Sequence, residues 1–319
     1  MNSRTKFIAV VLAVAIMCGC VFAKEAEFSW KDTKGQYADL LFGGRKVLRY
    51  MYAYDTSSSQ RTFETYKPLY HVFDAEGKNL LTNGPDGENP YGDGIKYPHH
   101  RGIFIGWNRL QCAGRQYDLW HMKGVAQVHQ KFLNMSGGSK QAMLTTVIHW
   151  NDNEGKPIIE EKRQMTVYRQ SGSTILLLDF VTELKAVKGD VNLNGDPEHA
   201  GFQYRPHNDV SNAPKDSRAK YLFHKDGIDP RKDKDLPWAA MSYGLNGKQY
   251  SVQHMNHPKN PKDTVYSAYR DYGRFGAFFK QNIEAGQTLT LRYCIWVTEG
   301  PMPERSQLEK NYSAYLKRR

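Results

Sequence analysis

The sequence predicts an all-β protein, a large antiparallel β-sandwich with a short C-terminal helix. Apolar and polar side chains alternate over residues 289–297, which is the period of a strand with one face in a core. Residues 175–181 form a nearly continuous apolar run, as expected of a strand buried on both faces. The pair Asn246-Gly247 separates two strand-forming segments and predicts a tight hairpin.

Local signals predict the remaining elements. Residues 304–317 predict the C-terminal helix, because Leu308 and Tyr312 recur at helical spacing. Ser306 and Glu309 have the spacing of a capping box near the start of this helix. Two stretches rich in turn-forming and charged residues predict long loops, which often carry binding residues: 83–96 and 190–235.

The first 23 residues have the pattern of a signal peptide. A basic start precedes an apolar run over residues 7–17, and small residues suited to signal peptidase follow. We therefore expect an exported protein, periplasmic or secreted, with residues 24–319 as a single β-sandwich domain. Lipoprotein anchoring at Cys18 or Cys20 is the less favoured alternative, because the preceding residues make a poor lipobox. No later stretch is apolar enough to cross a bilayer, so we expect no stable membrane span.

Charge and cysteine content narrow the class of protein. The net charge is +11, but the chain has no dense Lys/Arg run and no nucleic-acid motif, so we expect no nucleic-acid partner. Outside the predicted signal peptide two cysteines remain, Cys112 and Cys294. They form either one disulfide or two buried thiols, and we favour free thiols. A zinc site built from cysteines is excluded by their number.

Histidines gather in short clusters, each beside Arg, Trp, Tyr or Asn. The clusters are His99 with His100, His121, His199 with His207, and His254 with His257. Pro98 predicts that Tyr97 is extended. If the extended chain continues, His99 and His100 point to opposite faces. A single histidine near an aromatic ring is often structural, but four clusters in one β scaffold favour a functional site.

Polar residues on three segments extend this candidate site. Inward packing of Phe202 and Tyr204 places Gln203 and Arg205 on the opposite face of their segment. An extended chain from residue 270 aligns Arg270, Tyr272 and Arg274, and Arg with Tyr can bind a carboxylate, a sulfate or several sugar hydroxyls. A third segment places two charged residues on the core-facing side of a strand, as a buried salt bridge or the floor of a pocket: Glu161 and Arg163.

Several common catalytic motifs are absent from the sequence. It contains no His-x-His pair and no His-Glu-x-x-His, so a metal site has weak support. No Gly-x-Ser-x-Gly elbow supports a serine nucleophile, and no glycine-rich loop predicts a dinucleotide or phosphate site. We therefore expect no cofactor, with a divalent metal as the open alternative.

Four strings in the same order resemble an uncharacterised bacterial family often labelled "methane oxygenase PmoA-like". They are YPHHRG at 97–102, GFQYR at 201–205, HPKNP at 257–261 and YRDYGRFG at 269–276. The label does not suit this chain, because the methane monooxygenase subunit of that name spans the membrane several times. The resemblance implies a galactose-mutarotase-like β-supersandwich in a secreted protein of bacteria that degrade polysaccharides. In such folds His, Glu and Arg on the concave sheet face act on a sugar.

The leading interpretation is an exported carbohydrate-active enzyme, a lyase or hydrolase that cleaves or rearranges a sugar or glycoside by His/Glu/Arg general acid–base chemistry. The catalytic candidates are His100, His199, Glu161 and Arg270. The substrate-binding candidates are His99, Arg101, Trp107, His121, Arg163, Gln203, Arg205, His257, Asn260, Tyr269 and Tyr272. Two alternatives stay open: a non-catalytic carbohydrate-binding protein, and a metal-dependent hydrolase or oxygenase.

Overall fold

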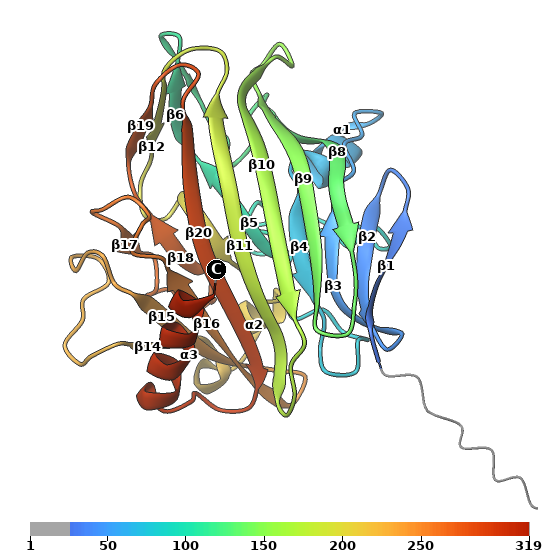
Figure 1. Cartoon of the computed structure of the whole chain (residues 1–319), viewed down its shortest axis with the longest axis vertical. Coiled ribbons are helices and arrows are strands. Elements are labelled where there is room, and N and C mark those ends of the chain that lie inside the picture. The colour runs from blue at the N-terminus through green and yellow to red at the C-terminus, as the bar shows by residue number, and fades with distance from the viewer. Residues whose placement is uncertain (1–25, 319) are drawn as a thin grey trace, which may run out of the picture.

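Two eight-stranded sheets packed face to face form the molecule in a computed structural model that describes residues 26–318 (Figure 1). The first sheet has the order β1 (Phe28–Thr33), β2 (Tyr37–Phe42), β3 (Arg45–Met51), β4 (Leu69–Val72), β5 (Ile103–Trp107), β13 (Ala200–Tyr204), β18 (Phe275–Phe278) and β17 (Val265–Tyr266). The second has the order β14 (Lys220–Phe223), β15 (Trp238–Leu245), β16 (Lys248–Asn256), β20 (Thr288–Glu299), β11 (Thr174–Ala186), β10 (Pro157–Tyr168), β9 (Gln141–Asn151) and β8 (Ala126–Ser136).

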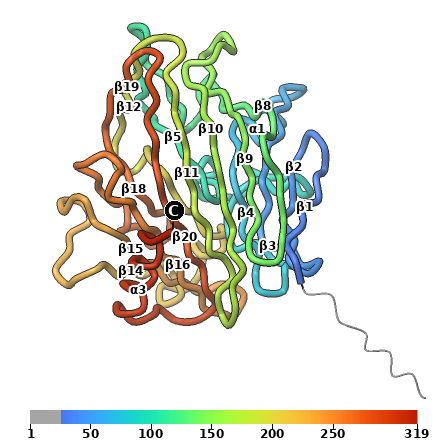
Figure 2. Tube along the Cα trace, viewed as in Figure 1, coloured from blue at the N-terminus to red at the C-terminus, as the bar shows by residue number. Residues whose placement is uncertain are grey.

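A third, four-stranded sheet lies at one end of the sandwich (Figure 2). Its order is β19 (Gln281–Ile283), β12 (Val191–Asn194), β6 (Arg109–Cys112) and β7 (Arg115–Tyr117). The pairings within all three sheets of the described chain are antiparallel. The predicted all-β antiparallel fold class is therefore confirmed.

The core lies between the two large sheets, and the patterns in the sequence explain it. Residues 289–297 lie within β20, and residues 175–181 lie within β11, which pairs with it. The predicted hairpin joins β15 to β16, where Asn246 and Gly247 have φ values of 53° and 73°. Positive φ at both central residues is what a tight hairpin turn of this kind requires.

The C-terminal helix α3 (Arg305–Lys317) covers the outer face of the second sheet (Figure 1). It buries Leu308 and Tyr315 against Trp238 and Cys294 of that sheet. The predicted capping box is wrong, because the helix begins after Glu304, whose side chain makes no capping hydrogen bond. Both remaining cysteines are buried free thiols.

The loop predictions hold for one segment and fail in part for the other. Residues 83–96 contain no helix or strand. Residues 190–235 contain β12, β13 and β14, besides the short helices α2 (Asp209–Asn212) and η1 (Lys215–Ser217). The remaining helix is α1 (Ser59–Thr65). The predicted signal peptide lies outside the described residues, and no helix within 26–318 is long and apolar enough to cross a membrane.

A buried histidine in this core predicts a pH dependence of stability. His254 is fully buried, with Nδ1 3.1 Å from the Tyr266 hydroxyl and Nε2 3.2 Å from the Phe202 carbonyl oxygen. Burial lowers the pKa of His254 from 6.5 to about 3. Between these two pH values the unfolded chain binds a proton that the folded chain does not, so the free energy of unfolding falls as the pH falls.

We expect the His254 contribution to cost about 2 kcal/mol of stability between pH 7 and pH 5. Urea unfolding at the two pH values checks this, with His254→Gln as the comparison. The variant should lose less stability on acidification than the wild type by that amount. Equal losses in the two proteins would show that His254 does not titrate on unfolding in this range.

Candidate functional site

The outer face of the first sheet carries a site built from loops that cross β5 and β13. A Cβ at Gly106 of β5 would lie 2.2 Å from the Leu119 carbonyl oxygen, so glycine lets residues 118–122 pass directly over the strand. Leu119 N also donates to the Trp107 carbonyl at 3.0 Å. Beside Gly106, the Phe104 ring supports the Trp120 ring at 4.8 Å. Residues 118–122 are therefore fixed on the sheet by close packing.

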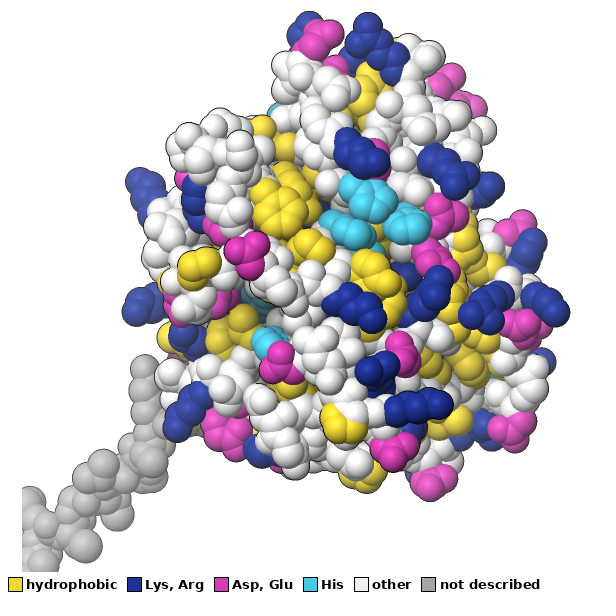
Figure 3. Space-filling model, turned by 180° about the vertical axis from the view of Figure 1, so that it is seen from behind, with side chains coloured by type: hydrophobic (Ala, Val, Ile, Leu, Met, Phe, Trp, Pro, Cys, Tyr) yellow, Lys and Arg dark blue, Asp and Glu magenta, His cyan; other side chains and the backbone are white. Residues whose placement is uncertain are grey.

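Three partly exposed histidines from three separate loops meet above this face. The ring centroids of His99 and His121 are 4.5 Å apart, and those of His121 and His199 are 5.1 Å apart. Histidine side chains gather on this face of the molecule, seen from behind the view of Figure 1 (Figure 3). The fold therefore brings together three of the histidine clusters that the sequence keeps 20 or more residues apart.

Two of these histidines are each held by an aspartate three residues earlier in the chain. His121 Nδ1 lies 2.9 Å from Asp118 Oδ2, and His199 Nδ1 lies 2.8 Å from Asp196 Oδ1. An ionised carboxylate only accepts hydrogen bonds, so Nδ1 carries the proton in both rings. Nε2 of each neutral ring is then the atom with the free lone pair.

The aspartates are kept ionised by the donors around them. Partial burial alone would raise the pKa of Asp118, but hydrogen bonds from His121 outweigh it and lower the pKa. Partial burial would also raise the pKa of Asp196, but hydrogen bonds from donors including Asn108 and His199 outweigh it and lower the pKa. Asn108 Nδ2 donates to Asp196 at 2.9 Å, which also ties this loop to the end of β5.

A buried layer lies directly beneath the three partly exposed rings. His100 is 2% exposed, with its ring 4.2 Å from that of His99 and 5.6 Å from Trp120. Burial, followed by the charge of Arg274, lowers the pKa of His100 well below its usual range. Burial and the nearby Lys67 lower the pKa of His99 to about 2. Both imidazoles are therefore neutral at physiological pH.

The rim of the site combines charge with aromatic rings. Glu198 accepts hydrogen bonds from Arg270 at 2.5 Å and from the Tyr269 hydroxyl at 3.1 Å. The Tyr97 ring is 42% exposed and lies 4.8 Å from that of Tyr272. The rim therefore offers ring faces, a carboxylate and a guanidinium to a ligand.

The backbone at the rim differs from the extended chain that the sequence predicts. Tyr97 has a φ of 56°, so the prediction of an extended residue before Pro98 is wrong. The next two residues form a turn, and the rings of His99 and His100 touch instead of pointing to opposite faces. Residues 270–273 also turn, which separates exposed Arg270 from fully buried Arg274.

Three candidates lie in the core and away from this face. Glu161 and Arg163 are fully buried between the two large sheets and form a bidentate ion pair at 2.7 and 2.8 Å. Of the two interpretations of this pair, the structure therefore shows the buried salt bridge. Trp107 is also fully buried, packs against Trp150 and donates to the Phe279 carbonyl. We correct the catalytic role expected of Glu161 to a structural one, because its carboxylate is fully buried and already holds Arg163, Trp150 and Thr182.

Two further candidates lie at the second sheet. His257 packs its ring against Tyr315 of α3 at a centroid distance of 5.7 Å. Asn260 is buried and joins its loop to Asn256 and to the backbone of Arg292 in β20. Both residues hold the loop after β16 in place, so we no longer count them in the site.

Three buried residues support the site from below. Arg101 is fully buried and donates to the carbonyls of Phe63 and Glu64 at the end of α1. Gln203 accepts from Arg274, and Arg205 donates to the Tyr272 carbonyl. These contacts hold the loops that carry the histidines.

Sequence reasoning missed several residues of the site, above all the two aspartates. A signal for them exists, since Asp-x-x-His occurs at 118–121 and again at 196–199. The buried Lys67 was not expected in the site either. Within residues 26–318, no group of three or more His, Cys, Asp or Glu side chains has the arrangement of a metal site.

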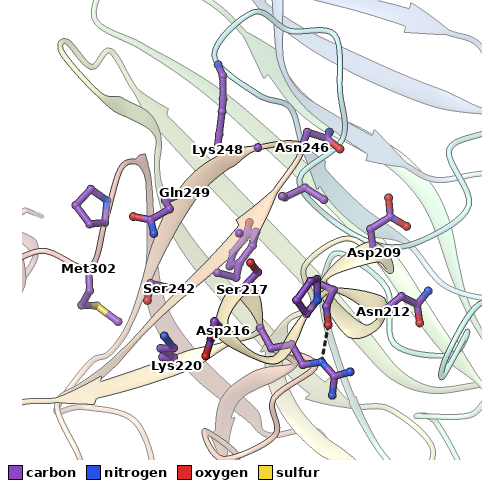
Figure 4. Close-up of a pocket in the computed structure, with 18 residues that line it drawn as sticks. Asp209, Asn212, Asp216, Ser217, Lys220, Ser242, Asn246, Lys248, Gln249 and Met302 are labelled. Carbon is purple, nitrogen blue, oxygen red and sulfur yellow. Dashed lines mark hydrogen bonds between the residues drawn. The ribbon is translucent and has the colours of Figure 1, made fainter.

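A separate pocket of about 670 Å³ lies beside the β15–β16 hairpin and residues 209–220 (Figure 4). Its lining contains no histidine. Lys248 is already paired with Glu76 and Glu299, while Arg218 donates from Nε to the Ala213 carbonyl. Two of its basic side chains are thus engaged, and the histidine site remains the stronger candidate for chemistry.

Comparison with known sequences assigns the chain to a family. The model of the "Family of unknown function (DUF6807)" matches residues 37–313. The chain belongs to this family. The match gives no support to the methane oxygenase PmoA-like label, and no functionally curated protein matches the chain.

Solved structures similar to this member of DUF6807 share little sequence with it. A heparan sulfate lyase mutant from Pedobacter heparinus is 9% identical, over 86% of this chain and 37% of the lyase, with a TM-score of 0.38. A GalM/aldose epimerase homologue from C. elegans is 9% identical, over 87% of this chain and 100% of the homologue, with a TM-score of 0.33. A galactose mutarotase-like protein from Clostridium acetobutylicum is 10% identical, over 87% of this chain and 100% of that protein, with a TM-score of 0.38. The chain spans little more than a third of the length of the lyase.

Proposed function

We propose that this protein is an enzyme that acts on a carbohydrate by general acid–base chemistry, with His121 and His199 as the proton-transfer groups. The observation that supports the proposal is the pair of imidazoles 5.1 Å apart, each held through Nδ1 by its own aspartate. An imidazole held in this way presents Nε2 as a base, and it becomes an acid once that atom is protonated.

The two histidines divide the proton transfers of the reaction. One accepts a proton from the substrate at Nε2, while the other, in its protonated form, donates a proton to a ring or glycosidic oxygen. Asp118 and Asp196 stabilise the imidazolium in each case. This role replaces that expected for buried His100, and His199 keeps the catalytic role that its sequence context predicts. Lyase, hydrolase and epimerase reactions all share this proton-transfer step.

The groups around the histidines suit a sugar. Tyr97 and Tyr269 supply aromatic rings at the rim, and Glu198 with Arg270 offers acceptors and donors to hydroxyl groups. A hollow of about 630 Å³ between α1 and residues 118–122 leads to His121. The family resemblance implies the same class of substrate, and export, which the N-terminal residues predict, would bring the enzyme to extracellular glycans.

A glycan screen of the purified mature protein tests the proposal. The panel contains neutral, uronic-acid, sulfated and keto-sugar oligosaccharides, and mass spectrometry reads the products with and without a chelator. We expect a product with the mass of an elimination, a hydrolysis or an isomerisation that forms despite the chelator. Activity that disappears with the chelator would point instead to a metal-dependent enzyme. Binding without any product would favour the carbohydrate-binding alternative.

A further inference from the structure

Three buried side chains beneath the histidines have polar atoms without any partner among the described residues. They are Trp120 Nε1, Arg274 Nε and both ring nitrogens of His100. Trp120 and Arg274 are fully buried, and His100 is 2% exposed. A buried donor without an acceptor costs free energy, so native proteins rarely leave one unsatisfied.

These side chains form one group. The Arg274 guanidinium carbon lies 5.9 Å from the centre of the Trp120 ring, and the His100 and Trp120 rings are 5.6 Å apart. Neutral His100 has one N–H to donate, Trp120 Nε1 only donates, and Arg274 Nε only donates. The group is therefore rich in donors and poor in acceptors.

The side chains around this group include basic residues that have no carboxylate partner. Arg274 bonds to the neutral partners Gln203 and Ser267, at 3.1 and 2.8 Å. Arg205 bonds to backbone carbonyls, and Lys67 donates to the Trp120 carbonyl at 2.8 Å. Within the described chain none of these three side chains forms an ion pair, and burial lowers the pKa of Lys67 well below its usual value and that of Arg205 to about 10, so the unpaired positive charge lies chiefly on Arg274. The carboxylate of Glu198 takes its hydrogen bonds from Arg270 and Tyr269 instead.

Burial of a positive charge is costly unless an anion accompanies it. An oxyanion with several acceptor atoms would complement both the donors and the charge. We propose that Arg274, Trp120 and His100 form an anion subsite that binds the carboxylate or sulfate group of an acidic sugar. The assignment of the anion to an acidic sugar rests on the proposed function, and it makes acidic sugars the substrate class of the histidine site.

The position of the subsite fits a substrate held by its charged group. His100 is the direct neighbour of His99, whose ring lies 4.5 Å from the proton-transfer group His121. The rings of partly exposed His99 and exposed Tyr97 lie 4.2 and 5.5 Å from the His100 ring, between the subsite and solvent. An acidic group bound there places the adjacent ring atoms of the sugar beneath the two imidazoles.

Small anions test the subsite without knowledge of the sugar. Inorganic sulfate and acetate are compared with chloride at equal ionic strength, and the midpoint of thermal unfolding is measured for each. We expect sulfate or acetate to raise the midpoint of the wild type, because a ligand of the folded state stabilises it. Arg274→Gln should lose this shift. Arg305→Gln, which removes a partly exposed cation paired with Asp226, should keep it.

Trp120→Phe covers the case in which Arg274→Gln does not fold. It removes one N–H donor and keeps an aromatic ring, so the midpoint shift should shrink but the protein should remain folded. The subsite would be overturned if neither anion shifted the midpoint of the wild type. It would also be overturned if the Trp120→Phe variant and the Arg274→Gln variant each showed the same shift as the wild type.

Acidic sugars then identify the source of the anion. Calorimetry compares glucuronate, its methyl ester, a glucose sulfate ester and glucose. We expect the favoured acid to bind at least about tenfold more tightly than its neutral counterpart, and Arg274→Gln to remove that difference. Turnover of a neutral glycan without any preference for an acid would refute the subsite and leave the proposed function intact. Anion binding without turnover of any glycan would refute the proposed function and leave the subsite intact.

Discussion

Replacement of His199 by alanine is expected to lower kcat on the substrate found in the glycan screen by about 10²- to 10⁴-fold. The variant loses one of the two proton-transfer groups and keeps the binding groups at the rim, so KM should change little. His199 is partly exposed, and its loss should leave the unfolding midpoint nearly unchanged. Steady-state kinetics and thermal unfolding of the same preparations check both expectations.

Two comparison variants separate this role from a general loss of charge or packing. His149→Ala removes another partly exposed histidine beside a carboxylate, Glu160, on the second sheet, and should keep full activity. Asp196→Asn keeps the imidazole but removes the carboxylate that fixes its tautomer, so kcat should fall and the pH profile should shift. If His199→Ala and His121→Ala both retain wild-type kcat, the two histidines are not the acid and base.

The substitution Glu161→Gln is expected to lower the free energy of unfolding by about 3–5 kcal/mol. It leaves the guanidinium of Arg163 buried between the sheets without a carboxylate. The Trp150 indole and the Thr182 hydroxyl, which donate to Glu161 at 2.7 Å each, also lose a charged acceptor. Urea unfolding at neutral pH measures the difference.

The neighbouring residue on the same strand provides the control. Glu160 is half exposed on the other face of β10, and Glu160→Gln should change stability by no more than about 0.5 kcal/mol. A loss of under about 1 kcal/mol in Glu161→Gln would mean that the buried pair contributes far less than its burial indicates.

The strands were predictable because their signal is local. The alternation over 289–297 is a property of one segment, and it decides which side chains of β20 face the core when the strand pairs with β11 and β16. The Asn246-Gly247 hairpin likewise needs only the two residues that adopt positive φ. Neither prediction depends on which segments become neighbours in space.

The site was less predictable because distant contacts determine its backbone. The turn at Tyr97 places its ring on Tyr272, a residue 175 positions later in the chain, and this contact overrides the preference of a residue before proline. Alternation also correctly placed Glu161 and Arg163 on an inward face. Alternation could not show whether that inward face lies between the two sheets or belongs to the outer face of the first sheet, where the histidines lie.

Each Asp–His pair is completed within four consecutive residues, and each four-residue unit is anchored separately near β5, through Gly106 in one case and Asn108 in the other. In the proposed mechanism the chemistry of each base is therefore set locally, while the gap between the bases is set by where two loops attach. A change in length of either loop alters the span across which protons are delivered without dismantling a base. Under the proposed function, proteins that keep both motifs but differ in the length of these loops would act on different bonds with the same two histidines.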